Sequence, residues 1–339
     1  MFRVVLCLFV LCCCMKGYSQ IGGQSVYQFL NLVTSPRQAA LGGKVITHFD
    51  YDVNAAQFNP ASINTEMDNH LSVNYGNYFG EITYGTASYA YTYDRHVQTF
   101  HAGVNYVNYG TFEGRDELGG LTSDFTGSEI ALSFGYSYNI PFSDFYLGAN
   151  AKLISSTLES YNSFGGALDL GALYIDTDND IHYALVIRNI GTQFTTYAGE
   201  REKLPLEILL GISQEVENVP IRWHVTLENL QQWNIAFSNP ARAQGNLDGG
   251  TQEEKVSFFN NALRHLILGA ELFPGKGFNI RVGYNFRRSE ELRIVDQRHF
   301  SGISAGFSLK INKIRFDYSY SRYTLAANTS LFGLMINLQ

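Results

Sequence analysis

"SEIALSFGYSYN" (residues 128–139) is the stretch that decides the fold. Polar or small residues such as Glu129, Ser133 and Asn139 alternate in it with apolar ones. The apolar set is Ile130, Leu132, Phe134, Tyr136 and Tyr138. Because successive side chains of a β-strand point to opposite faces, the pattern predicts a strand with one apolar and one polar face.

The same alternation recurs in "FNIRVGYNF" (278–286), "GISAGFSLK" (302–310) and "KIRFDYSYS" (313–321). Strands of a soluble β-sandwich usually have about five or six residues, whereas several of these runs reach the length of about ten that membrane barrels use. The 22 Tyr and 24 Phe residues suit the aromatic girdles of such a barrel. A soluble periplasmic β-protein is therefore the disfavoured alternative.

We expect an all-β fold in which residues 69–339 form a closed transmembrane antiparallel β-barrel of about 14 strands. The expected strands are 69–79, 81–94, 96–110, 126–140, 143–158, 160–176, 180–190, 203–216, 219–230, 256–272, 276–287, 297–310, 312–323 and 328–339. With a periplasmic N-terminus, the connections after odd-numbered strands face outward, and they include the long ones at 110–126, 190–203, 230–256 and 287–297. Long outer loops with short periplasmic turns are typical of outer-membrane barrels.

The first residues predict a secretory signal peptide over 1–19, with Arg3 ahead of an apolar run from Val4 to Cys14 that is too short for a membrane helix. All four cysteines lie in this peptide, so the mature chain would hold no disulfide and no thiolate metal site. Loss of Arg3 and Lys16 lowers the basic residues from 24 to 22 against 31 acidic ones, which changes the net charge from −7 to −9. This charge argues against nucleic acid as a partner.

Residues 20–68 precede the first strand and show no clear period. They contain "TSPRQAALGGKVITHFDYDVNAAQFNPASI" (34–63), with a Gly42-Gly43 pair and an Asn59-Pro60-Ala61 stop. A segment of this length without regular structure is uncommon unless it has a function. We expect it to form a hatch in the barrel lumen, where glycines permit close approach and Pro60 sets the exit towards the first strand.

Several segments resemble a known family: "GGQSVYQFLNLVTSPRQAALGG" (22–43), "DYD" (50–52) and "FNPASI" (58–63) look like the N-terminal signature of the PorQ family of Bacteroidetes type IX secretion systems. "VIRNIG" (186–191), "HLILGAELFP" (265–274) and "IRVGYNFRR" (280–288) extend the likeness along most of the chain. The resemblance implies a fourteen-strand barrel of the bacterial outer membrane, similar to the FadL fatty-acid transporters, with an N-terminal hatch. It also implies a place in the cell-surface attachment complex with PorU, PorV and PorZ.

Charged and turn-forming residues define the expected interior. The hatch motif consists of Arg37, Leu41, Gly42, Gly43, Asp52, Asn59, Pro60 and Ala61. The expected lumen charges on polar strand faces are Lys152, Arg281, Arg315 and Asp317. Because isolated charges are costly in a confined lumen, we expect these groups to pair with Arg37, Asp50 and Asp52.

The sequence has no HExxH pair and no P-loop, and its GxSxG match, "GISAG" (302–306), lies within the alternating run 302–310 and not at a strand-to-helix turn. "DTDND" (176–180) begins like a calcium loop, but Ile181 replaces the turn glycine and Ile187 stands where the bidentate Glu belongs. We therefore expect a non-enzymatic protein without a metal site or a cofactor.

The first functional hypothesis is an outer-membrane anchor, surrounded by outer-membrane lipid, that holds a PorZ-like surface protein during cargo processing and attachment to lipopolysaccharide. The 230–256 connection is the first choice for the partner site, with Trp233, Ile235 and Phe237 as interface anchors. An equally weighted alternative is that these three residues only extend a strand above the membrane. The alternative function is a FadL-like channel for hydrophobic small molecules, which would need a continuous apolar path through the lumen.

Overall fold

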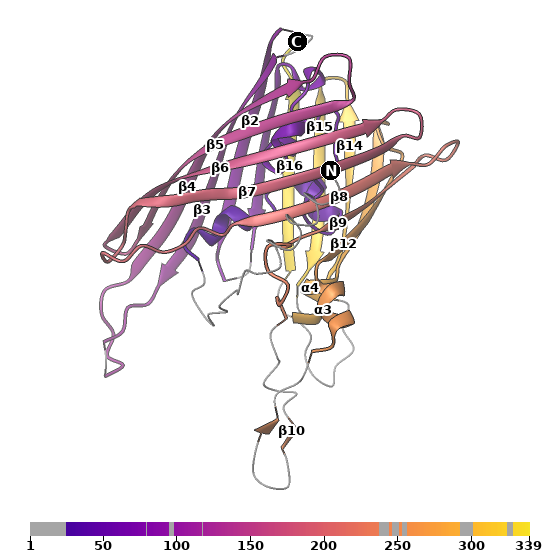
Figure 1. Cartoon of the computed structure of the whole chain (residues 1–339). Coiled ribbons are helices and arrows are strands. Elements are labelled where there is room, and N and C mark those ends of the chain that lie inside the picture. Colours follow the sequence, from indigo (N-terminus) through magenta and orange to yellow (C-terminus); the bar gives the residue numbers. More distant parts are fainter. Residues whose placement is uncertain are drawn as a thin grey trace, which may run out of the picture.

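Fourteen antiparallel strands close into one barrel in the computed structural model (Figure 1). The last strand, β16 (Asn328–Asn337), pairs with the first, β1 (His70–Asn77), so the ring has no open edge. Closure satisfies the backbone N–H and C=O groups within the wall, as lipid surroundings demand. The structure describes residues 25–78, 80–94, 98–116, 118–236, 244–245, 251–252, 256–291, 301–323 and 328–339.

The other strands of the ring follow the predicted order along the chain. They are β2 (Thr83–Asp94), β3 (Gln98–Phe112), β4 (Phe125–Asn139), β5 (Phe145–Leu158), β6 (Tyr161–Asp176), β7 (Ile181–Thr195), β8 (Glu207–Glu215), β9 (Ile221–Leu227), β12 (Leu266–Leu272), β13 (Phe278–Asn285), β14 (Ile303–Ile311) and β15 (Ile314–Arg322). Two short strands, β10 (Gln244–Gly245) and β11 (Thr251–Gln252), pair outside the ring.

Strand β4 shows why the wall belongs in a membrane. Leu132 and Phe134 are exposed on the outer face, whereas Ser133 and Ser137 are buried. An apolar outer face around a polar interior is the arrangement of a transmembrane barrel, because the outer face contacts lipid chains. The predicted fold class is confirmed. None of the helices in the described ranges is long and apolar enough to cross a bilayer.

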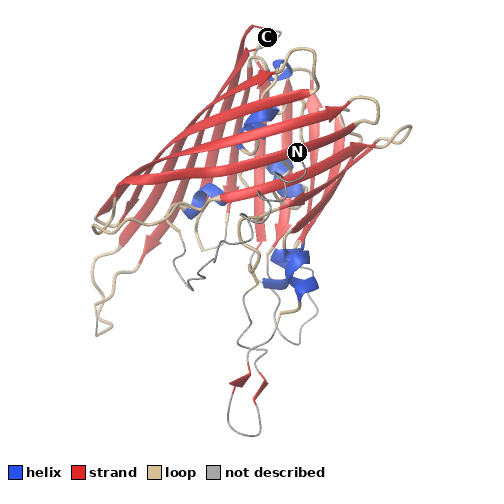
Figure 2. Ribbon diagram, in the orientation of Figure 1, coloured by secondary structure: helices blue, strands red, loops and turns tan. Residues whose placement is uncertain are grey.

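The two ends of the barrel differ (Figure 2). Short connections at 140–144, 177–180, 216–220, 273–277 and 312–313 lie at the end that carries the C-terminus, which we call the turn end. The described parts of the long connections, 113–116, 118–124, 196–206, 228–236, 256–265, 286–291 and 301–302, lie at the opposite end, which we call the loop end. The predicted segregation of long and short connections is therefore present.

Several strand boundaries differ from the prediction; the expected strand 180–190, for example, continues to Thr195 as β7. The expected strand 256–272 begins as a helix, α3 (Phe258–Arg264), because the Ser257 side chain accepts a hydrogen bond from the N–H of Asn260 and caps the helix. The expected strand 276–287 ends at Asn285, where α4 (Phe286–Glu291) begins. The expected strand 203–216 begins only at Glu207, after Pro205, which lacks the N–H that a ladder needs.

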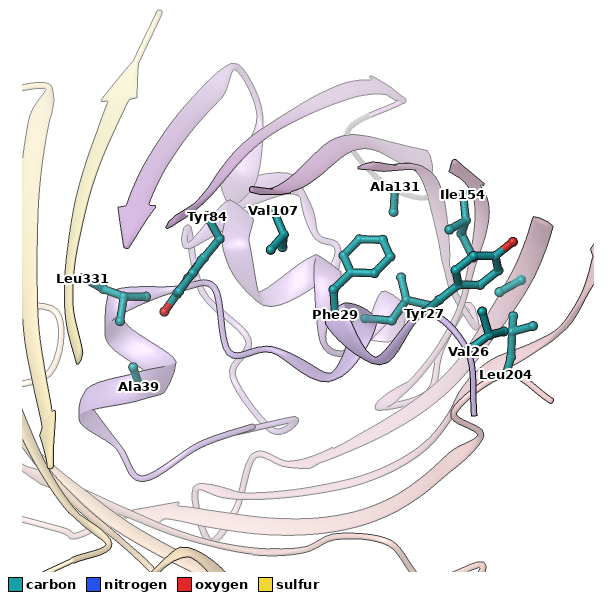
Figure 3. Close-up of a cluster of buried hydrophobic side chains, with 12 residues drawn as sticks. Val26, Tyr27, Phe29, Ala39, Tyr84, Val107, Ala131, Ile154, Leu204 and Leu331 are labelled. Atoms are coloured by element: carbon teal, nitrogen blue, oxygen red, sulfur yellow. The ribbon is translucent and has the colours of Figure 1, made fainter. Parts of the chain in front are cut away.

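The hatch lies inside the barrel and is built of short helical turns rather than the irregular chain that its sequence indicates (Figure 2). They are η1 (Gln28–Asn31), α2 (Pro36–Ala40), η2 (Val53–Gln57), η3 (Pro60–Ser62) and η4 (Thr65–Met67). Helix α2 contacts β13 to β16, and η3 contacts β4 to β6 on another part of the wall. Tyr27 and Phe29 join an apolar cluster with wall residues such as Val107 and Ile154 (Figure 3).

Candidate functional site

The candidate site is the contact between hatch and wall, and glycines set its closest approach. Gly42 has φ +96°, a backbone conformation that favours glycine. A Cβ on Gly283 of β13 would lie 2.0 Å from the Gly42 nitrogen, so a glycine is needed on the wall as well. Beside this contact, the carbonyl of buried Leu41 accepts a 3.0 Å hydrogen bond from His224 Nε2 of β9. The Leu41-Gly42-Gly43 element is therefore a docking point on the wall.

The Asn59-Pro60-Ala61 element docks on the opposite part of the wall. Asn59 Oδ1 accepts a 2.9 Å hydrogen bond from the Ala61 N–H, and Asn59 Nδ2 donates a 2.7 Å bond to the Ile46 carbonyl. Gly148 of β5 and Gly171 of β6 lie against this turn, and a Cβ on either would overlap with it. The element thus caps a helical turn and presses it against the wall.

Buried and partly buried charges join the hatch to strands β9, β12 and β15 and continue within the wall to β13. We call this set the charged network: Arg37, Asp50 and Asp52 of the hatch, with Arg222, Glu271, Arg281, Arg315 and Asp317 of the wall. It contains four arginines and four carboxylates, and Arg222 pairs in addition with the more exposed carboxylate of Glu215 at 2.8 Å. Mutual pairing of opposite charges lowers the cost of placing them inside the barrel.

Arg37 is the centre of the charged network. Its Nη1 lies 2.8 Å from Asp50 and 3.4 Å from Asp52, and its Nη2 lies 2.9 Å from Glu271 of β12. Burial alone would raise the pKa of the Asp50 carboxyl, but Arg37, His48 and Arg222 together outweigh that effect, Arg37 most of the three, and hold this pKa below its usual range. Arg37 therefore binds two hatch carboxylates and one wall carboxylate at once.

A second link joins Asp52 to β15. Arg315 Nη2 lies 3.2 Å from Asp52, and Arg315 Nε lies 2.7 Å from Asp317. Arg281 continues the chain of pairs within the wall, at 2.7 Å from Asp317 and 2.8 Å from Glu271. Asp52 also caps η2, since its Oδ1 accepts a 3.1 Å bond from the Asn54 N–H.

Of the four expected lumen charges, Arg315 pairs with the hatch, through Asp52, whereas Lys152, Arg281 and Asp317 have their ion-pair partners in the wall. Lys152 Nζ lies 2.6 Å from Asp169 and 2.9 Å from Asn189, so its partners belong to the wall and not to the hatch. Sequence reasoning missed Glu271 and Arg222. Glu271 lies in the otherwise apolar run "LILGAEL". The alternating pattern places it on the face that points into the barrel, and this could have identified it as a lumen charge.

A second group of charges lies towards the loop end. Lys44 of the hatch is 2.5 Å from Glu207 at the start of β8, and Arg188 of β7 is 3.0 Å from the same carboxylate. Lys44 and Glu207 line a cavity of about 370 Å³ between the hatch and α4. The hatch is thus ion-paired to the wall near both ends.

The proposed partner residues have different environments. Trp233 is about half exposed and stacks on His265, with ring centroids 5.4 Å apart. Ile235 is only 5% exposed, so it is not available as the exposed anchor that the sequence indicated. Phe237 lies outside the described residues. Within the described ranges, no group of three or more His, Cys, Asp or Glu side chains could hold a metal ion.

Comparison with known proteins identifies the fold. No protein-family model matches the chain, and no curated protein matches it by sequence. The toluene transporter TbuX of Ralstonia pickettii superposes with a TM-score of 0.53 at 14% identity, covering 92% of this chain and 98% of TbuX. A FadL homologue of Pseudomonas aeruginosa gives a TM-score of 0.53 at 11% identity, covering 90% and 98%. The chain has the FadL-type outer-membrane barrel fold.

The FadL-type fold accounts for the main geometry described above: fourteen strands, a closed wall and an N-terminal hatch in the lumen. At these identities the likeness concerns architecture, and the chemistry has to come from this chain's own residues. Those residues form ion pairs and capped turns that hold the hatch against the wall.

Proposed function

We propose that the protein is a non-enzymatic outer-membrane anchor, a PorQ-type component of a type IX secretion attachment complex that holds a PorZ-like surface protein. PorU and PorV are further partners in this proposal. The resemblance of residues 22–63 to the PorQ signature supports it. The observation that carries it is the set of exposed apolar side chains on the long connections, at the end of the barrel where a surface partner would bind.

Two patches make up this set. Leu118 and Leu121 are 96% and 74% exposed on the 113–124 connection, which projects beyond the wall (Figure 1). Phe258 and Phe259 of α3 are also largely exposed, and the Trp233 ring lies 4.9 Å from that of Phe258. Aromatic and large apolar side chains that leave water on binding supply much of the energy of protein interfaces.

The test is affinity purification of the barrel in mild detergent from its native membrane, followed by mass spectrometry. Two double variants, L118S/L121S and F258S/F259S, remove one patch each. Phe142→Ser is the matched control, because Phe142 is fully exposed but lies at the turn end. We expect a large surface protein to copurify with the parent and the control and to be lost in at least one double variant. Copurification that survives both double variants would contradict the docking surface.

A transport function is the second candidate: a FadL-like channel for hydrophobic small molecules. The likeness to TbuX and to the FadL homologue, taken alone, favours this function over the anchor. The charged network supports the anchor instead, since a hatch held by buried ion pairs is costly to move.

Uptake separates the two functions. Cells that lack their own fatty-acid transporter and express this barrel would be given radiolabelled oleate or toluene. The anchor function predicts uptake equal to that of cells with an empty vector. Saturable uptake by the expressed barrel, without a copurifying surface protein, would favour the channel.

A further inference from the structure

The cavity between the hatch and α4 has the dimensions of a small-molecule site. Leu32, Val33 and Lys44 of the hatch line it, together with Glu228, which follows β9, and Arg288 of α4. Its volume of about 370 Å³ lies near the lower end for ligand pockets. Residues of α4 at the loop end line the cavity, and no residue of the charged network does.

Most charges around this cavity are already paired. Glu207 accepts from both Lys44 and Arg188, at 2.5 and 3.0 Å. Arg287 Nε lies 2.8 Å from Glu291. These pairs leave little electrostatic attraction for a ligand.

Two groups of opposite charge differ from this pattern. Glu228 lines the cavity and is 7% exposed as a residue; its carboxylate makes no hydrogen bond or salt bridge within the described residues, although the positive charges of Lys44, Arg287 and Arg288 act on it. Arg288 also lines the cavity, and its Nη1 is buried without a hydrogen-bond acceptor in the same part of the chain. The Arg288 guanidinium lies 4.3 Å from the centroid of the Tyr323 ring, which orients it.

A carboxylate that is largely removed from water and makes no direct hydrogen bond or salt bridge costs free energy, and so does a buried guanidinium N–H without an acceptor. A purely anionic ligand would pair with Arg288 but would be repelled by Glu228. A purely cationic ligand would pair with Glu228 but would be repelled by Arg288. A molecule that carries both charges satisfies both groups.

We propose that this cavity binds a small zwitterion, with its ammonium group on Glu228 and its anionic oxygen on Arg288 Nη1. Leu32 and Val33 provide an apolar surface for a short side chain on the ligand. A dipeptide and a phosphoethanolamine headgroup share this chemistry. The proposal goes beyond the anchor function and does not depend on it.

The test is isothermal titration calorimetry on the full mature chain in detergent. The probes are glycyl-L-leucine, its N-acetyl derivative, its C-terminal amide, and phosphoethanolamine. We expect at least one zwitterion to bind, and either blocked dipeptide to bind at least about tenfold more weakly than the free dipeptide, since each block removes one charge-assisted contact. Tighter binding of phosphoethanolamine would indicate a headgroup-like ligand, and tighter binding of the dipeptide a peptide-like one; both support the site.

Two variants assign the contacts. Glu228→Gln is expected to make glycyl-L-leucine and its N-acetyl derivative bind equally well. Arg288→Gln is expected to make glycyl-L-leucine and its C-terminal amide bind equally well. Glu113→Gln, on the exposed 113–124 connection, is the control and should change neither preference. Absence of binding by both zwitterions, or equal binding of free and blocked dipeptides to the parent protein, would overturn the proposal. These comparisons use the parent chain alone, so they decide the question even if a variant fails to fold.

Discussion

Arg37 is the residue on which the contact between hatch and wall depends most. It is buried, and its guanidinium is shared among Asp50, Asp52 and Glu271. Removing one partner of a buried ion pair destabilises a fold more than replacing both partners with apolar residues, because the remaining charge stays buried without compensation. The three carboxylates around Arg37 make this consequence larger than it would be for a single pair.

We predict that Arg37→Met lowers the free energy of unfolding by about 3–5 kcal/mol, since it leaves buried carboxylates with less compensation. Urea unfolding of the barrel in lipid vesicles measures the loss. Arg115→Met is the matched control, because Arg115 pairs with Glu113 at 3.1 Å but both side chains are more than half exposed. The control should cost less than about 1 kcal/mol. Equal losses in the two variants would mean that the charged network does not stabilise the fold.

At the scale of elements, the hatch is held by backbone contact as well as by charge. Strand β13 offers Gly283 where the chain turns at Leu41 and Gly42, and strands β5 and β6 offer Gly148 and Gly171 to the Asn59-Pro60-Ala61 turn. Wall glycines therefore mark where hatch elements dock.

Gly283→Ala is predicted to displace the 41–43 turn, because the new Cβ would overlap backbone atoms that cannot rotate away. Overpacking of this kind costs about 1–3 kcal/mol, so proteolysis within the hatch should become faster in the folded barrel. Gly85→Ala in β2 is the control, since the nearest atom to its Cβ, the Asn74 carbonyl oxygen, is 3.5 Å away. Unchanged protease resistance in the Gly283 variant would show that the turn does not dock there in solution.

At the scale of the whole molecule, exposed apolar side chains face two different solvents. Phe134 lies on the outer face of β4, 59% exposed, and is expected to contact lipid. Leu118 is 96% exposed on a connection beyond the wall and is expected to contact water or a partner. Exposure alone does not separate these environments, whereas position along the barrel does.

Arginine substitution separates them experimentally. Phe134→Arg should cost about 2–4 kcal/mol, as a charge near the bilayer midplane does in other barrels. Leu118→Arg should stay within about 0.5 kcal/mol of the parent, because no lipid surrounds it. Folding titrations in lipid vesicles measure both values. A similar cost for both variants would contradict the assigned position of the membrane.

The sequence by itself determined the wall, the hatch segment and the outer and inner faces. These features depend on period-two alternation and on turn chemistry, which are local, so "SEIALSFGYSYN" is sufficient to orient β4. Only the tertiary structure decided which charges meet. Glu271 and Arg37 are 234 positions apart, and their contact depends on barrel closure and strand register. The tertiary structure also decided that Lys152 pairs within the wall, that Ile235 is buried and that Glu228 faces a cavity. Each of these outcomes depends on side chains that the fold brings together from distant parts of the chain.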